Sequence, residues 1–130
     1  MREKLNLLLE KHCVTIKNNV ARLGEHLNGA RRDGAVSREA LREANALAHQ
    51  LKGSSGTAGF HDICVAATVL YDHLNAIAAL EGTPLRQGVN QAIELYERLS
   101  VTSRAASPHS SALYLVMPEC IAQTAAKSGV

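Results

Sequence analysis

The sequence predicts an all-α fold, an antiparallel up-down four-helix bundle with a C-terminal extension. Four segments carry apolar residues at every third or fourth position, which is the spacing of a helix with one buried face. Residues 1–100 contain no sustained alternation of apolar and polar residues, so no strand is expected there. Aromatic side chains make up only 3% of the 130 residues, and the 46% apolar share comes mainly from aliphatic residues. Four amphipathic helices with short connections pack most simply as such a bundle.

The first helix is expected over residues 5–27, a length of about 35 Å. Its apolar face consists of Leu5, Leu9, Cys13, Ile16, Val20, Leu23 and Leu27. The pair Asn28-Gly29 is a typical helix stop. The stretch 31–35, which contains Asp33-Gly34, predicts a loop.

The second helix is expected to begin after Ser37, a good N-cap, with Glu39 favourably placed in the first turn. Its inward positions are Leu41, Ala44, Ala48, Leu51 and Ser55. The inward positions of the third helix are Ile63, Ala67, Leu70, Leu74 and Ile77. Gly82 stops that helix, and Thr83-Pro84 predicts a cap followed by proline at the first position of the fourth. The inward positions of the fourth helix are Leu85, Val89, Ala92, Tyr96 and Leu99.

We assign the bundle to residues 1–104 and the extension to residues 105–130. Residues 103–111 are rich in Ser and Ala and include Pro108, which predicts that the fourth helix ends there. The apolar run 113–117 would dock on the bundle, cover an edge or mediate self-association. Periodicity does not decide among these roles on so short a run.

Composition excludes several classes of protein. The 14 Lys and Arg residues against 12 Asp and Glu give a net charge of +2, which argues against a dedicated nucleic-acid-binding protein. The 3 cysteines contain no C-x-x-C pair, so we expect neither a disulfide framework nor a structural metal site. Glu10 and Lys11 interrupt the apolar run 7–9, and no segment has the ~18 apolar residues of a membrane span. We therefore expect a cytoplasmic protein that does not insert into membranes.

Residues 48–60 break the local rules of helix formation. Gly53 and Gly56 would each cost the second helix ~1 kcal/mol relative to alanine, and function is expected where a sequence accepts such a loss. If Ala48 and Leu51 are buried, their neighbours His49 and Lys52 turn toward solvent. The exposed ridge then consists of Asn45, His49, Lys52, Gly53 and Gly56.

This ridge has the chemistry of half a phosphoryl-transfer site. A free imidazole has a pKa of about 6.5 and is a good nucleophile near neutral pH. Lys52 would balance charge on a phosphoryl group carried by the ring of His49, and Gly53 would leave room for a second macromolecule. Phosphoryl transfer depends chiefly on in-line approach and electrostatic stabilisation.

These residues resemble a known signature. The segment reads His49-Gln50-Leu51-Lys52-Gly53-Ser54-Ser55, and Gly59 follows it. It is similar to the signature of histidine-containing phosphotransfer (HPt) domains of bacterial phosphorelays, which fold as antiparallel four-helix bundles. The resemblance covers roughly residues 5–100. Ala58 replaces a larger aliphatic residue and Tyr71 an acidic residue often found there, and neither is expected to touch the proposed chemistry.

The resemblance implies a phosphocarrier. No ATP-binding segment is evident in the sequence, so we do not expect the chain to phosphorylate itself and do not expect it to be an enzyme. His49 would be phosphorylated on Nε2 and exchange the group with the aspartate of a response-regulator receiver domain, which would supply Mg²⁺; the chain would need no cofactor of its own. Lys52 would stabilise the phosphoryl charge, and Gly53 would permit close docking. A sensor histidine kinase, hybrid or simple, would be a further partner, and we expect a monomer.

The same resemblance implies a surface for these partners. Arg38, Arg42 and Lys52 would meet the acidic pocket of the receiver and aid encounter and orientation. The low-relief part of this partner surface would consist of Asn45, Ala46 and Gly56.

Two alternative functions come from other classes. The first is a helical adaptor that binds a partner through a bundle face without chemistry. The second is a metal- or haem-binding bundle that uses side chains such as His61 and Cys64, although two ligands do not make a site. Ser54 and Ser55 are expected to be packing residues, because no nucleophile elbow surrounds them.

Overall fold

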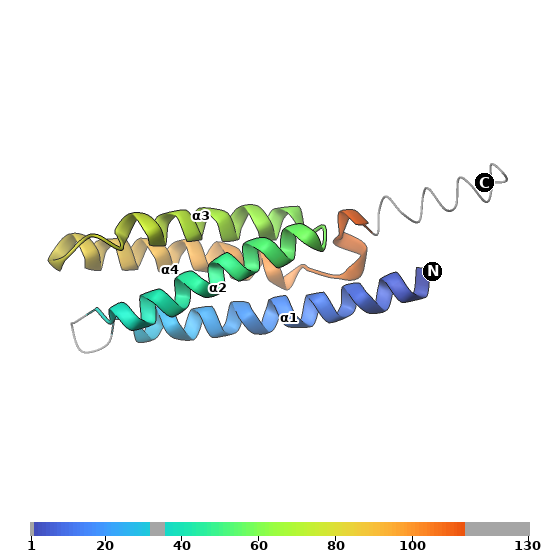
Figure 1. The fold of residues 1–130 in the computed structure, drawn as a ribbon, viewed down its shortest axis with the longest axis horizontal. Coiled ribbons are helices and arrows are strands. Elements are labelled where there is room, and N and C mark those ends of the chain that lie inside the picture. The colour runs from blue at the N-terminus through green and yellow to red at the C-terminus, as the bar shows by residue number, and fades with distance from the viewer. Residues whose placement is uncertain (1, 32–35, 114–130) are drawn as a thin grey trace.

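Four antiparallel helices make up the computed structural model, which describes residues 2–31 and 36–113. They are α1 (Arg2–Gly29), α2 (Arg38–Thr57), α3 (His61–Ile77) and α4 (Gly82–Arg104), and a 3₁₀ turn, η2 (Pro108–Ser110), follows them. Each helix packs on its two neighbours around the bundle, in the order α1, α2, α3, α4 and back to α1 (Figure 1). No strand occurs in the described ranges. The predicted all-α, up-down bundle is confirmed.

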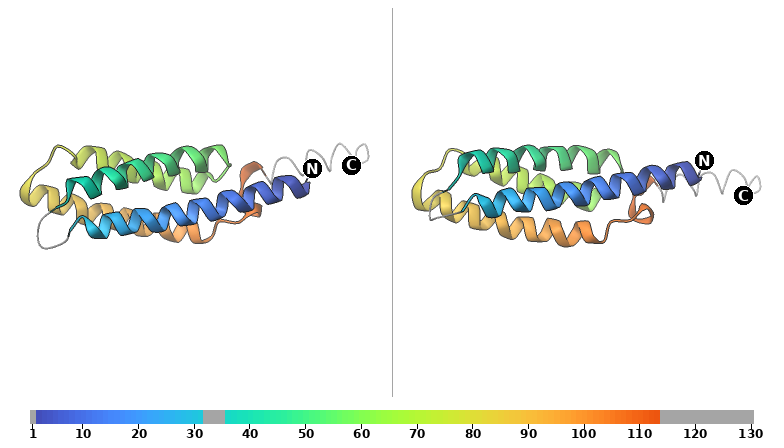
Figure 2. Two further views of the ribbon diagram at one scale, coloured as in Figure 1. Left: turned by 60° about the horizontal axis from the view of Figure 1, so that its bottom comes forward. Right: turned by 90° about the horizontal axis from the view of Figure 1, so that it is seen from below.

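The predicted apolar faces form the core. All five inward positions of α3 are buried, and α2 adds Leu47 to the five expected of it. The first turns of α1 extend past the other helices (Figure 2). Leu5 is consequently only half-buried, and Leu7 and Leu8 are 60% and 51% exposed. Tyr96 of α4 is also half-buried, lying against Gly24 of α1, where a Cβ atom would collide with its hydroxyl group.

Of the two predicted N-caps, the one for α2 is confirmed and the one for α4 is wrong. Ser37 caps α2 as expected, because its hydroxyl oxygen accepts a hydrogen bond of 3.2 Å from the backbone N–H of Ala40. The predicted cap at Thr83 is wrong: α4 begins at Gly82, and its N-cap is Glu81, which makes no side-chain hydrogen bond to the helix. Pro84 then occupies the third helical position, where a missing N–H costs no helical hydrogen bond.

The chain after α4 returns to the turn that joins α2 to α3. The hydroxyl of Ser111, which is fully buried, donates to the carbonyl of Ala58 at 2.6 Å. The N–H of Ala112 donates to the carbonyl of Gly59 at 2.8 Å. Residues 111–113 therefore lie against this turn, and most of the apolar run 113–117 lies outside the described residues.

Gly59 is expected to tolerate no side chain. Its φ of +84° is a left-handed conformation, and a Cβ atom there would lie 2.7 Å from the hydroxyl of Ser111 and 3.0 Å from the backbone nitrogen of Leu113. Gly82, with a φ of +61°, has no atom within 4 Å of such a Cβ and serves as a matched control. Urea unfolding should show a loss of about 1 kcal/mol for Gly82→Ala, from backbone strain alone. Gly59→Ala should lose about 2–4 kcal/mol, because overpacking adds to that strain. Equal losses would show that residues 111–113 do not pack on Gly59.

Candidate functional site

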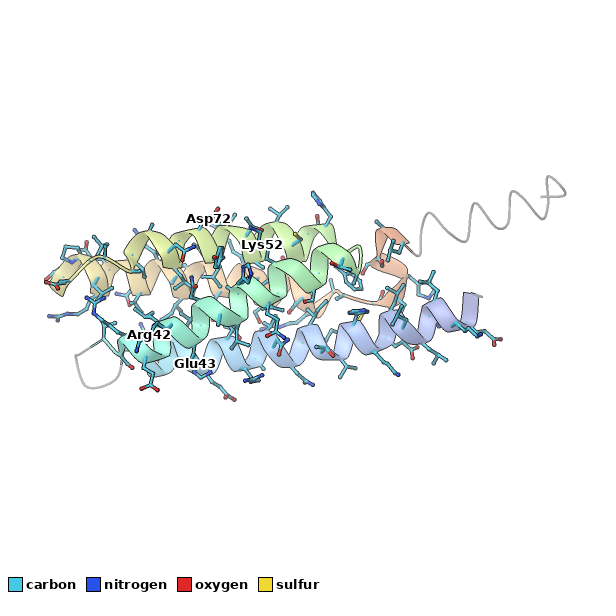
Figure 3. The ribbon with its side chains drawn as sticks, viewed as in Figure 1. Arg42, Glu43, Lys52 and Asp72 are labelled. Atoms are coloured by element: carbon cyan, nitrogen blue, oxygen red, sulfur yellow. The ribbon has the colours of Figure 1, made fainter. Side chains whose placement is uncertain are left out.

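The middle of α2 presents an imidazole to solvent. Leu47, Ala48 and Leu51 are buried on the core side of this helix. His49 is exposed on the opposite side, and Lys52 is half-buried one turn further along. Figure 3 shows Arg42 near the start of α2 and Lys52 nearer its end. The structure therefore places His49 and Lys52 on one accessible face of a regular helix.

Gly53 and Gly56 both lie within α2, but their surroundings differ. A Cβ atom at Gly53 would have no neighbouring atom within 4 Å, so this position opens to solvent beside His49. A Cβ atom at Gly56 would lie 3.3 Å from the Sγ atom of Cys64 on α3. The thiol of Cys64 also donates to the carbonyl of Lys52 at 3.4 Å. Gly53 thus leaves a gap in the surface, whereas Gly56 lets α2 and α3 approach each other closely.

Tyr71 of α3 belongs to the site, which corrects the expectation that it would lie apart from the chemistry. The centroids of the His49 and Tyr71 rings are 5.2 Å apart, with a tilt of 42° between the ring planes. The Nζ atom of Lys52 lies 5.5 Å from the centroid of the same tyrosine ring. Both proposed functional side chains of α2 therefore contact one aromatic ring on α3.

Chain topology contains a signal for this contact. In an antiparallel helix pair, residues equally far from the connecting turn along the chain face each other. His49 and Tyr71 are equally far from Phe60, and so are Asn45 and Asn75, whose side-chain amides are joined by a hydrogen bond of 3.0 Å. The apolar periodicity shows which face of each helix is buried but gives no such register between helices.

Arg38 and Arg42 differ in their contacts. The guanidinium of Arg38 donates to the carbonyls of Ala78 at 2.9 Å and Leu80 at 2.8 Å, at the C-terminal end of α3. A cation at this end of a helix is also favourable for the helix dipole. Arg42 is exposed and forms no hydrogen bond or ion pair with the described residues. Arg38 is therefore engaged within the chain, whereas the Arg42 guanidinium is not engaged by any described residue.

A groove of about 460 Å³ lies between α2 and α3, on the side of the bundle that carries His49. Leu41, Leu74 and Ala78 line it together with Arg42 and Asn45. Asn45 stands one helical turn before His49. The groove thus continues the exposed face toward the start of α2. Ala46, the next residue along α2 after Asn45, is exposed.

The structure also bears on other kinds of site. Within the described residues, no group of three or more His, Cys, Asp or Glu side chains is placed to hold a metal ion. The hydroxyl of the buried Ser55 donates to the carbonyl of Leu51, as expected of a packing residue. None of the helices in the described ranges has both the length and the hydropathy needed to cross a bilayer.

The chain matches a known protein family. A family model described as the Hpt domain matches residues 8–102, which covers all of α2 and α3 and most of α1 and α4. Domains of this family are phosphocarrier modules of two-component phosphorelays. Searches of curated proteins and of solved structures found no match. Because the family model spans well over half of the chain, this protein belongs to the Hpt domain family.

Proposed function

We propose that His49 accepts a phosphoryl group from the phospho-aspartate of a receiver domain and returns it to such a domain. The observation that carries the proposal is the exposed imidazole of His49 on α2, with Lys52 one turn away and an open position at Gly53. The helix presents the ring nitrogen without a loop that must first become ordered. Family membership supports the phosphocarrier role, and the assignment to His49 rests on the geometry.

The proposed step is one in-line substitution at phosphorus. The lone pair of His49 Nε2 forms the N–P bond while the bond between phosphorus and the aspartyl oxygen breaks, and the aspartate leaves as a carboxylate. The ring keeps its proton on Nδ1. We propose that the receiver's acidic residues hold Mg²⁺, which would neutralise charge on the phosphoryl oxygens, and that Lys52 contributes a cation from this chain.

The partner surface would extend from Gly56 past His49 to the groove beside Arg42. Gly56 and Ala46 give it low relief, and Asn45 borders both His49 and the groove. We propose that receiver domains and a sensor histidine kinase, hybrid or simple, dock here in turn. The same proposal places the chain in the cytoplasm as a monomer.

Transfer from a phosphorylated receiver tests the proposal. The receiver carrying labelled phosphate is incubated with this chain and Mg²⁺. The label is expected to move to this chain, to be acid-labile and base-stable as in a phosphohistidine, and to map to the peptide that contains His49. A label that stays on the receivers tested, or maps to another residue, would overturn the proposal.

Arg42→Gln and Arg38→Gln are expected to have different effects. Arg42→Gln should slow association with the receiver severalfold at low salt, and 0.5 M salt should largely remove the difference, because screening weakens steering by exposed charges. Arg38→Gln should instead lower the free energy of unfolding by about 1 kcal/mol, through loss of its two hydrogen bonds to α3. Stopped-flow association and urea unfolding measure the two effects. Interchanged results would place Arg38, and not Arg42, on the partner surface.

A further inference from the structure

We infer that Tyr71 is a positioning residue for phosphoryl transfer at His49, and that its ring holds the imidazole beside an ammonium group whose charge is not neutralised. The inference rests on the proposed function and adds a residue of α3 to it. It starts from the double contact of the Tyr71 ring, with His49 on α2 and with the Nζ atom of Lys52.

The first consequence of this contact is a fixed imidazole. A centroid distance of 5.2 Å with a tilt of 42° is typical of favourable aromatic pairs. The hydrogen bond between Asn45 and Asn75 and the one between Cys64 and the Lys52 carbonyl lie on either side of the pair along the two helices. α2 and α3 are thus held in register around His49. Its ring rests against α3 on one side, while the residue as a whole remains exposed.

The second consequence concerns the charge of Lys52. The ammonium lies 5.5 Å from the centroid of the Tyr71 ring, within the range of a cation–π interaction. The Lys52 ammonium forms no ion pair or hydrogen bond with the described residues. The Tyr71 ring attracts this cation through its π face and brings no carboxylate to pair with it, so it holds the ammonium in place and leaves its charge uncompensated.

An acidic residue in place of Tyr71 would act differently. A carboxylate would pair with the ammonium of Lys52 and would offset part of its charge. Tyr71 therefore gives the ammonium a weakly bound resting position. From there it can move to a phosphoryl oxygen on His49, because a charge-assisted hydrogen bond is stronger than an exposed cation–π contact.

Two variants at this position test the inference. Tyr71→Phe keeps the ring, and Tyr71→Leu removes it but keeps an apolar side chain. The rate of transfer to His49 is measured at saturating phosphorylated receiver, so that docking does not limit it. The Phe variant should transfer within about twofold of the parent rate, and the Leu variant about fivefold more slowly.

A second readout needs no phosphate. The ring protons of His49 should show a ring-current shift in NMR spectra of the parent and the Phe variant, and this shift should disappear in the Leu variant. A purely structural role of Tyr71 would instead lower the melting temperature and leave the saturating transfer rate unchanged.

A double-mutant cycle isolates the link to Lys52. Lys52→Gln should slow transfer severalfold in the parent and by a clearly smaller factor in the Leu variant, because that variant has already lost the ring that holds the ammonium. Equal factors, or equal rates for the parent and the Phe and Leu variants, would overturn the role of Tyr71 and leave the proposed function intact. A parent chain that accepts no label on His49 would overturn the proposed function itself, and the NMR shift would still report the ring contact.

Discussion

His49→Gln should abolish phosphoryl acceptance while leaving the fold intact. An amide has no nucleophilic nitrogen, so no N–P bond can form at this position. His49 lies on the exposed side of α2, where substitutions usually change the free energy of unfolding by less than about 0.5 kcal/mol. Label transfer from a phosphorylated receiver measures the first effect, and thermal unfolding measures the second.

His61 provides the matched control. It is exposed at the start of α3, so His61→Gln removes an accessible imidazole without touching the ridge on α2. This variant should accept label as the parent does. If the His49→Gln chain retained full signalling function in cells, the adaptor alternative would replace the phosphocarrier. If it still accepted label in the assay, the acceptor would be another residue.

Gly53→Gln should slow transfer from a receiver domain by tenfold or more without destabilising the bundle. A Cβ atom at Gly53 has no neighbour within 4 Å, so the new side chain projects outward beside His49 and keeps a docking protein away. The same substitution removes a glycine from a helix, which favours folding by up to about 1 kcal/mol. The transfer rate and the melting temperature should therefore change in opposite senses.

Comparing a small phosphoryl donor with a receiver domain distinguishes hindered docking from a slower reaction at the imidazole in the Gly53→Gln variant. A small donor such as phosphoramidate should phosphorylate His49 at the parent rate, because it does not need the gap at Gly53. Gly29 lies at the end of α1, and a Cβ atom there also has no neighbour within 4 Å. Gly29→Gln should therefore leave the rates of transfer from both donors unchanged. Equal slowing with the small and the large donor would show that the glutamine hinders the imidazole itself.

The features that could be predicted from the sequence depend on one helix at a time. The apolar stripes predicted four helices and their buried faces, because a helix must bury one continuous side to fold in a bundle. The exposure of His49 and Gly53 followed from the burial of Ala48 and Leu51 beside them. The cap at Ser37 was also a local property of the chain.

The features that were missed depend on two helices meeting. The contact of Tyr71 with His49 requires the register between α2 and α3, which helical periodicity leaves undetermined. The contacts of Arg38 with the end of α3 were missed for the same reason. Thr83 had the composition of a cap, but α4 begins one residue before it, at Gly82, with Glu81 as the N-cap.

The polar contacts of α2 have a consequence for the energetics of complex formation. At one end of α2, Arg38 forms hydrogen bonds to the end of α3. At the other end, Ser111 and Ala112 form hydrogen bonds to the turn that follows α2. Between these anchored ends, the central residues of α2 remain accessible while their backbone is already ordered. An incoming protein would thus meet a preorganised surface, and little conformational entropy would be lost from this side when the two associate.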